Sequence, residues 1–502
     1  MASLDELKLQ GQIVAGHRPC PRLVVDAAQW SRATLELVAG RWSLLSLWGE
    51  ADTVHMAMLE PQLGEAVVLS LPCPSGSFPS VGMLHPPALR LERSLHDLFG
   101  LVPEGSPDPR PWLDRDQWGV RFPLGPRLPA SAPRGYQMLP VDGEGLHQIA
   151  VGPVHAGIIE PGHFRFTANG ETVVRLEERL GYVHKGIDGL LIGADLERGA
   201  QLAGRVSGDS TVAYAIAFAR AAEAALGVTV PARALWLRAL CAELERLANH
   251  LGDIGGVCND VAFALMLSHC SVLRENVLRA AERAFGHRLM RDVVVPGGVA
   301  RDLDDTGKGS IRQMAKTVRQ RFPELIELYD ETASLQDRTV TTGRLSAELV
   351  QQYAAGGYVG RASGRDFDAR RDLAYPPYDQ LRFKVPVLTE GDVNARVWIR
   401  IREVKQSLGL IEQILSELPE GECRVPLPAI IEPAEGLALV EGFRGDVLAW
   451  LRLTDGAIAR CHLRDPSWFQ WPLLEAAIEG NIVADFPVCN KSFNCSYSGV
   501  DL

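Results

Sequence analysis

The chain has 502 residues, 46% of them hydrophobic and 23% charged, and carries a formal net charge of −11. This length predicts several domains with a large buried core, and the composition is that of an ordinary globular protein. The acidic balance argues against a nucleic-acid partner, which selects a basic face. No stretch approaches about 18 uncharged apolar residues, so no membrane span is predicted, and the N-terminus lacks the basic and apolar regions of a signal peptide.

Nine cysteines are scattered along the chain, and none of them forms a Cys-x-x-Cys pair. This pattern is typical of a reduced, cytoplasmic protein whose cysteines are mostly small core residues. We therefore expect no zinc or iron–sulfur site held by this chain alone.

The first 125 residues predict a small α+β domain. Short runs rich in β-forming residues indicate strands at Arg22–Val25, Trp42–Trp48 and Ala66–Leu71. Residues Leu89–Phe99 predict a helix that ends at Gly100. The Pro- and Gly-rich stretch Phe122–Arg134 indicates a linker. We place this linker at residues 126–145, before a second domain that spans residues 146–502.

The second domain opens with a loop and a hairpin. Phe164 and Phe166 alternate with polar residues, Asn169–Gly170 is a tight-turn signal, and Thr172–Leu176 returns as the second strand.

The rest of the second domain is predicted to be mainly helical. Apolar residues three and four positions apart indicate two helices with one buried face each, Arg233–Leu251, stopped by Gly252, and Val393–Leu415. A strand pair closes the pattern at Gly445–Leu453 and Ile458–Leu463, joined by a turn at Thr454–Gly456. The body is thus a helical core with small β elements.

Two polar clusters are candidate sites with simple alternatives. A Gly- and Pro-rich loop before the hairpin carries His155, Glu160 and His163. Such a loop suits proton handling at a rigid edge, although both histidines could equally bond to backbone groups. A second cluster, Glu243, Arg246 and His250, lies on the first predicted helix, where the default interpretation is a solvated face of ion pairs.

A third cluster, Arg205–Ser210, precedes the apolar run Thr211–Ala219, which predicts a buried helix. The simple interpretation is an N-cap, in which Ser207, Asp209 or Ser210 accepts hydrogen bonds from the first amides of that helix. Arg205 is expected to have an anion or a carboxylate as its partner.

These clusters belong to longer motifs that resemble a known family. Four segments resemble the large subunit of membrane-linked group 4 nickel–iron hydrogenases. They are similar also to the D-type subunit of NADH-quinone oxidoreductase (complex I). These segments are His155–Phe166, Leu180–Ile187, Glu243–Leu251 and Glu441–Asp446. Segments that resemble the C-type subunit of complex I are Glu92–Arg93, Asp97–Gly100 and Pro107–Leu113. The resemblance covers nearly the whole chain. It implies an N-terminal α+β domain like that C-type subunit, fused to a mainly α-helical domain like the hydrogenase large subunit.

The resemblance also identifies where a metal centre would lie. Catalytic relatives hold nickel and iron with four thiolates, because soft anionic sulfur suits that metal. The matching positions are Ser207, Ser210, Cys495 and Ser498, with the register of the last two uncertain by about one residue. A neutral hydroxyl is a poor ligand for a soft metal. We therefore expect that the nickel–iron centre is lost and that this chain binds no metal.

The D-type subunit of complex I implies a second use of the same region, the docking of a quinone in a complex that also binds NAD. Gly208 stands where that family has a tyrosine, and either His155 or His163 matches its histidine. The residues expected to line the pocket are Glu160, a histidine, Arg205, Asp209 and Arg444. Glu160 matches the proton-relaying carboxylate of the hydrogenases, and the alternative is a structural network of ion pairs.

Three functional hypotheses follow from the resemblance. The first is the catalytic-arm subunit of a redox complex, peripheral on the inner face of the cell membrane. It would dock on an iron–sulfur small subunit, which holds the cluster, and on antiporter-like membrane subunits, which translocate ions. The second is a working nickel–iron hydrogenase with unusual ligands, and the third is a non-catalytic scaffold or coupling subunit. Relatives often lose a C-terminal peptide, but no cleavage is expected here because the chain stops four residues beyond Ser498.

Overall fold

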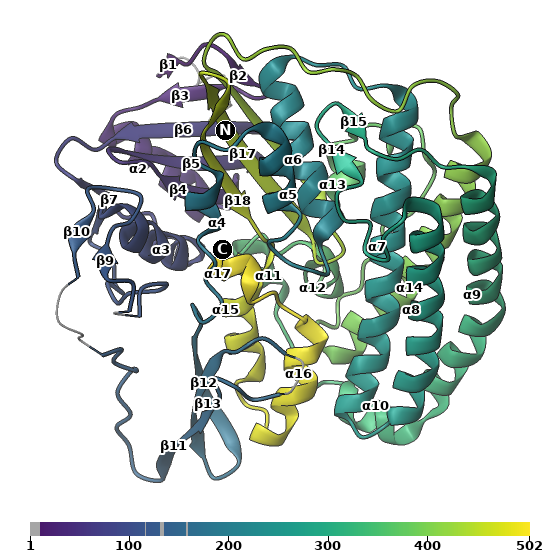
Figure 1. Ribbon diagram of the computed structural model, residues 1–502. Coiled ribbons are helices and arrows are strands. Elements are labelled where there is room, and N and C mark those ends of the chain that lie inside the picture. Colours follow the sequence, from purple (N-terminus) through teal and green to yellow (C-terminus); the bar gives the residue numbers. More distant parts are fainter. Residues whose placement is uncertain (1–10, 116, 131–134, 157–158) are drawn as a thin grey trace.

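The computed structural model describes residues 11–115, 117–130, 135–156 and 159–502. Its N-terminal part combines strands and helices, and its C-terminal part is rich in long helices (Figure 1). The helices are α2 Ala27–Val38, α3 Leu89–Phe99, α4 Ile187–Leu191, α5 Leu196–Ala203, α6 Thr211–Leu226, α7 Ala232–Asp260, α8 Ala264–Phe285, α9 Asp305–Glu331, α10 Ala333–Thr339, α11 Ala347–Gln352, α12 Gly357–Ala362, α13 Ala369–Asp372, α14 Val393–Glu417, α15 Ser467–Ile478, α16 Phe486–Phe493 and α17 Ser498–Asp501. The strands are β1 Gln12–Ile13, β2 His17–Arg18, β3 Arg22–Val24, β4 Ser43–Gly49, β5 Thr53–Glu60, β6 Glu65–Pro72, β7 Ser77–Pro79, β8 Val102–Glu104, β9 Val120–Arg121, β10 Leu128–Pro129, β11 Leu146–Val151, β12 His163–Asn169, β13 Thr172–Arg179, β14 Val294–Val295, β15 Gly298–Val299, β16 Ala434–Glu441, β17 Asp446–Thr454 and β18 Ala457–Arg464.

The N-terminal sheet has the strand order β1-β3-β6-β5-β4. Its predicted strands are confirmed as β3, β4 and β6, and the predicted helix is α3, which ends at Gly100 with φ 77°. The sequence missed β5, the strand between β4 and β6. Both faces of β5 are covered, so its side chains do not alternate between apolar and polar. Strand β10 lies in the predicted linker and pairs with β9, which precedes it, and residues 131–134 of the linker lie outside the described residues.

A second sheet joins the two ends of the chain. It has the order β18-β17-β16-β2, so the N-terminal strand β2 pairs in parallel with β16. The predicted strand pair is confirmed as β17 and β18, whereas β16 was missed. Helix α6 packs closely against this sheet, because a β-carbon at Gly436 would lie only 1.9 Å from the carbonyl oxygen of Ala221.

Long helices form the other side of the molecule, where α7, α8, α9 and α14 lie side by side (Figure 1). Both helices predicted from apolar spacing are present as α7 and α14. The prediction that Gly252 stops the first of them is wrong, since α7 continues to Asp260. The glycines of this extension allow close packing: a β-carbon at Gly255 would lie 2.9 Å from Cys270 of α8. Tertiary contact thus outweighs the weak helix propensity of glycine.

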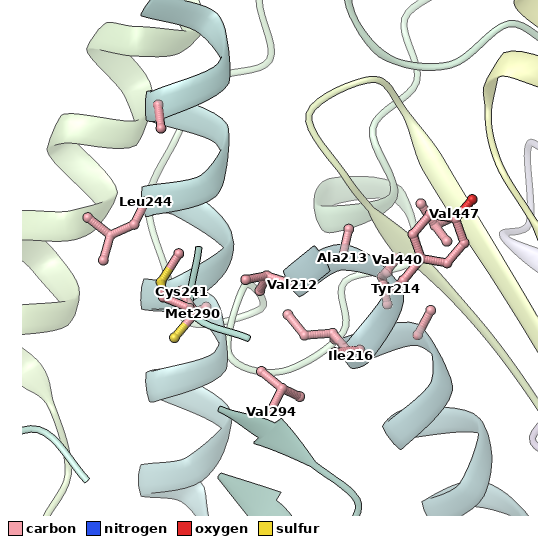
Figure 2. Packing of buried hydrophobic residues seen from close by; sticks show 14 of the residues in the cluster. Val212, Ala213, Tyr214, Ile216, Cys241, Leu244, Met290, Val294, Val440 and Val447 are labelled. Atoms are coloured by element: carbon pink, nitrogen blue, oxygen red, sulfur yellow. The ribbon is translucent and has the colours of Figure 1, made fainter. Parts of the chain in front are cut away.

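The apolar run that predicted a buried helix is α6, which is buried almost all round. Figure 2 shows Val212 and Ile216 of this helix on the side of Cys241, Met290 and Val294, with Val440 and Val447 of the second sheet on the other side. This central packing fixes the start of α6, which bears the third polar cluster.

A three-stranded sheet, β11-β12-β13, extends from the lower side of the molecule in Figure 1. The predicted hairpin is confirmed as β12 and β13, and β11 adds an edge strand that the sequence did not indicate. Helices α15, α16 and α17 lie between this sheet and the helical bundle (Figure 1). Among the described residues, no helix is long and apolar enough to cross a membrane.

Candidate functional site

The C-terminal tail is held in place by its own carboxylate at Asp501. The two oxygens of this side chain accept hydrogen bonds from the backbone amides of Gly181 and Val183, at 2.8 and 3.0 Å. His184 Nδ1 lies 2.6 Å from the carbonyl oxygen of Asp501. Burial raises the pKa of Asp501 to about 6, although the two amides oppose this effect. The motif from residue 180 to 187 is therefore the anchor of the tail.

The start of α6 meets the tail through two hydroxyl groups. Ser207 Oγ lies 3.0 Å from Ser496 Oγ and donates a hydrogen bond of 2.7 Å to Asp209. The tail residue against Ser207 is thus Ser496, one position after Cys495. Cys495 is buried in a hydrophobic cluster, where burial raises the pKa of its thiol well above the ordinary value.

The position three residues after Ser496 is Gly499, and no side chain fits there. A β-carbon at Gly499 would lie 2.5 Å from the carboxylate of Asp465, which is fully buried and accepts a hydrogen bond of 2.8 Å from Tyr214. The four positions grouped at this junction are Ser207, Ser210, Ser496 and Gly499. This set offers no thiolate and no carboxylate, so it does not fit a nickel–iron centre.

Arg444 and Asp209 form an ion pair beside the two hydroxyl groups. Arg444 Nη1 donates to Asp209 Oδ1 at 2.8 Å and to Ser210 Oγ at 3.1 Å, and Nε donates to the carbonyl oxygen of Asn494 at 2.5 Å. Burial by itself would raise the pKa of Asp209, but the Arg444 guanidinium and the Ser207 hydroxyl lower it to about 2. Asp209 is therefore ionised at neutral pH and links the start of α6 to the tail.

The Gly- and Pro-rich loop reaches the other side of the tail. Glu160 Oε2 accepts a hydrogen bond of 3.0 Å from the amide of Ser498, and His155 Nε2 lies 3.3 Å from the Tyr497 hydroxyl. His163 instead lies beside its own loop, with Nδ1 3.5 Å from the carbonyl oxygen of Gly152. Of the two candidate histidines, only His155 contacts the tail among the described residues, which omit 157 and 158 of this loop.

Arg205 has the carboxylate partner expected of it, but that partner is not in the tail. Its guanidinium donates two hydrogen bonds of 2.7 Å to Asp292, and both side chains are more than one-third exposed. The structure thus brings Glu160, His155, Asp209 and Arg444 together around residues 494–498, whereas Arg205 pairs with a different loop.

The N-cap interpretation of the third cluster is wrong. The side chain of Ser210 makes no capping hydrogen bond. The first amides of α6, Val212 and Ala213, donate instead to the carboxylate of Glu245 on α7, at 2.7 and 3.1 Å. Burial raises the pKa of Glu245 to about 8. A buried carboxylate from another helix therefore caps α6, and no local sequence pattern marks such a long-range cap.

The interpretation of Glu243, Arg246 and His250 as a solvated face is also wrong, because all three side chains are buried. Glu243 accepts hydrogen bonds from Arg370 at 2.9 Å, Tyr378 at 2.8 Å and Ser407 at 2.7 Å. His250 Nε2 lies 2.6 Å from Glu403, which Arg361 also contacts. Burial opposes ionisation of Glu403, yet Arg361 and His250 hold its pKa well below the ordinary value.

This internal network joins charged residues from several separate motifs of the sequence. Arg361 donates 2.9 Å to Glu441 of β16, and Arg370 is paired with Asp368 at 2.7 Å. The network ties α7, α12, α13, α14 and β16 into one block through paired buried charges. Short-range spacing does not reveal the network, since several of its partners lie far apart in the chain, such as Glu243 and Arg370, which are 127 residues apart.

In the part of the chain that the structure describes, the site offers no clustered metal ligands, and three residues of the tail belong to it that the sequence did not indicate. Among the described residues, no group of three or more His, Cys, Asp and Glu side chains is placed to hold a metal ion. The tail residues that the sequence did not single out are Ser496, Tyr497 and Gly499. A register one residue later in the tail motif would have selected Ser496 and Gly499, whereas nothing in the sequence distinguishes Tyr497.

The α+β unit, the helical domain and the junction of α6 with the tail define a protein of the hydrogenase large-subunit type that is related to complex I. Residues 25–134 match the family described as respiratory-chain NADH dehydrogenase, 30 Kd subunit, and residues 260–436 match the 49 Kd subunit. The chain is 31% identical over 439 residues to formate hydrogenlyase subunit 5 of Escherichia coli, covering 84% of this chain and 77% of that protein.

Other relatives agree with this match. The carbon monoxide-induced hydrogenase of Rhodospirillum rubrum is 32% identical, over 69% of this chain and 97% of that protein. A solved chain from the membrane-bound sulfane sulfur reductase, an archaeal respiratory membrane complex, superimposes with a TM-score of 0.68 at 26% identity, over 72% of this chain and 100% of that chain. The protein belongs to the family of hydrogenase large subunits that is related to the 49 Kd and 30 Kd subunits of respiratory-chain NADH dehydrogenase.

Proposed function

We propose that this chain is the peripheral-arm subunit of a membrane-associated oxidoreductase complex and that it works without a nickel–iron centre. The observation that carries the second part is the contact of Ser207 with Ser496, at 3.0 Å, together with the absence of space for a side chain at Gly499. These are the positions at which α6 meets the tail. In place of thiolates they carry two hydroxyl groups and a glycine, which has no side chain.

The charge around this junction supports the proposal. The Arg444 guanidinium is fixed there by Asp209 and by the Asn494 carbonyl group. The guanidinium of Arg444 and the carboxylate of Asp209 lie within hydrogen-bond distance, so each compensates the charge of the other. In this proposal the ion pair holds the start of α6 against the tail without a metal ion.

The names of the relatives support the proposed assembly. They include a membrane-bound hydrogenase subunit of Pyrococcus furiosus and a subunit of NADH-quinone oxidoreductase of Koribacter versatilis. On this basis we propose that the chain docks on an iron–sulfur small subunit and on antiporter-like membrane subunits, peripheral on the inner face of the cell membrane. This proposal also divides the chain into two units joined by a linker at residues 126–145. The N-terminal unit is like the C-type subunit of complex I, and the second unit is hydrogenase-like.

Within the site, we assign proton handling to Glu160 and His155. Glu160 is exposed and accepts a hydrogen bond from the tail, so it can exchange protons with water beside the junction. The region next to Gly208 is open, since a β-carbon there would meet no atom within 4 Å. An electron acceptor such as a quinone would approach from this side. Arg205 and His163 hold neighbouring loops in this scheme.

Metal analysis of the purified, assembled complex tests the loss of nickel. We expect nickel far below one atom per chain and no hydrogen-dependent reduction of a viologen dye. Stoichiometric nickel with hydrogen-dependent activity would establish a working hydrogenase with unusual ligands and overturn the proposal.

A second candidate function is a scaffold, which the direct hydrogen bonds between the site's side chains favour. The variant Glu160→Gln distinguishes the scaffold from the redox role. Its matched control is Glu171→Gln, which lies on an exposed turn. Loss of a proton-transfer group lowers turnover by about 100-fold. We expect such a loss in the intact complex with Glu160→Gln alone, and unchanged turnover with normal assembly would support the scaffold.

A further inference from the structure

A cavity of about 700 Å³ lies between the N-terminal sheet and the helical domain. Its walls come from both halves of the chain and are mostly apolar, with Leu45, Leu59 and Ala66 on one side and Ala224, Leu235 and Leu439 on the other. It is separate from the junction of α6 with the tail, because it opens beside Arg220, ten residues or about 15 Å along α6 from Ser210. The volume is in the range of sites for small organic ligands.

Arg220 is the unusual residue of this cavity. Its side chain is largely buried, its Nε has no hydrogen-bond partner, and no ion pair of its guanidinium is found in the described parts of the chain. The guanidinium stacks on the ring of Tyr375, 4.6 Å from the centroid. The nearest acidic side chain on the same helix, Glu223, is already paired with Arg238. An arginine with five donors is thus held in place and left without an anion.

The geometry points to a binding site for a single-chain amphiphile with an anionic head, either a carboxylate or a phosphate. The head would accept hydrogen bonds from Arg220, and the apolar tail would lie against the leucine and alanine walls of the cavity. A carboxylate or phosphate suits the planar guanidinium because both accept paired hydrogen bonds. A second cavity that Arg220 also lines has a volume of only about 20 Å³, so it is too small to take the head.

Two other facts agree with this assignment. Burial lowers the pKa of Arg220, an effect that Tyr375 and Glu223 only partly oppose. The cavity also lies on the seam between residues that match the 30 Kd family and the helical domain, so a ligand there would contact both halves. Binding would therefore stabilise the folded chain in proportion to its affinity.

Calorimetric titration of the purified chain tests the site with three amphiphiles of equal length: decanoate, decyl phosphate and decyltrimethylammonium, each below its micelle concentration. We expect one-to-one binding of an anion and at least about tenfold weaker binding of the cation, the effect of one charge-assisted hydrogen bond. Binding of decanoate alone would indicate a fatty acid, and binding of decyl phosphate would indicate a lipid phosphate. Equal binding of the cation, or no binding of either anion, would overturn the proposal.

Two variants locate the binding site. Arg220→Met keeps the bulk of the side chain and should weaken anion binding at least about tenfold. It should not lower the melting temperature of the free chain, since it removes an unpaired charge. Ala224→Phe fills the apolar part of the cavity and should also weaken binding. The control is Arg279→Met, an exposed arginine on α8. An Arg220→Met chain that binds as tightly as the wild type would refute the assignment.

Discussion

Breaking the ion pair between Arg444 and Asp209 tests whether the junction of α6 with the tail is held by charge. Burial alone would raise the pKa of Asp209, but Arg444 and Ser207 lower it from its ordinary 3.8 to about 2, which corresponds to about 2 kcal/mol in favour of the ionised folded form. About one-third of the Asp209 side chain is exposed, and screening by solvent reduces this energy. We therefore expect a coupling free energy of about 1–2 kcal/mol at pH 7.

The assay is a double-mutant cycle with Asp209→Asn, Arg444→Met and the double variant, measured by urea denaturation. The cycle cancels the other hydrogen bonds of Arg444, such as the one to Asn494. Because the folded pKa of Asp209 is depressed, the coupling is fully present above the unfolded pKa of about 4 and is lost as pH falls toward 2. The exposed pair Arg319 and Glu412 is the control, with an expected coupling of about 0.5 kcal/mol. A coupling at Asp209 no larger than this control, or one that does not change with pH, would refute the reasoning.

Three further predictions concern stability. Arg361→Met should destabilise the folded chain by about 3–5 kcal/mol in urea denaturation, because it leaves buried carboxylates unpaired, whereas a loss below about 1 kcal/mol would show that the network relaxes freely. Gly499→Ala should lower the free energy of unfolding by about 1–3 kcal/mol, because the added methyl group crowds Asp465. An unchanged melting temperature, together with a crystal structure of the variant in which Asp465 has not moved, would contradict this. Glu245 has a folded pKa raised from 4.5 to about 8, so its stability contribution is fully present below about pH 4.5 and falls as pH rises from 5 toward 8. The difference in unfolding free energy between wild type and Glu245→Gln should accordingly fall by about 2–4 kcal/mol across that range, and a difference independent of pH would be inconsistent with the raised pKa.

The sequence was most informative where periodicity and composition act locally. The spacing of apolar residues predicted α14, the helix stop at Gly100 was correct, and the hairpin around Asn169–Gly170 formed as expected. The resemblance of extended motifs identified the family before any contact was known. These features depend on residues near one another in the chain, so the sequence carries them directly.

Other features depend on contacts between distant residues and could not be predicted locally. Helix α7 passes through Gly252 because α8 packs against its glycines, and β5 shows no alternation because both of its faces are covered. The cap of α6 is another example, since its carboxylate comes from Glu245 on α7.

By itself, the sequence determined the family and the order of the two units, and it predicted hydroxyl groups, at Ser207 and Ser210, in the positions of two thiolates. Only the tertiary structure decided which tail residue faces them. Ser496 lies against Ser207, while Cys495 turns into a hydrophobic cluster, because the anchoring of Asp501 by the backbone at residues 181 and 183 sets the register of the tail. A shift of one residue would bring a different side chain against Ser207, and no local pattern in the tail fixes that register.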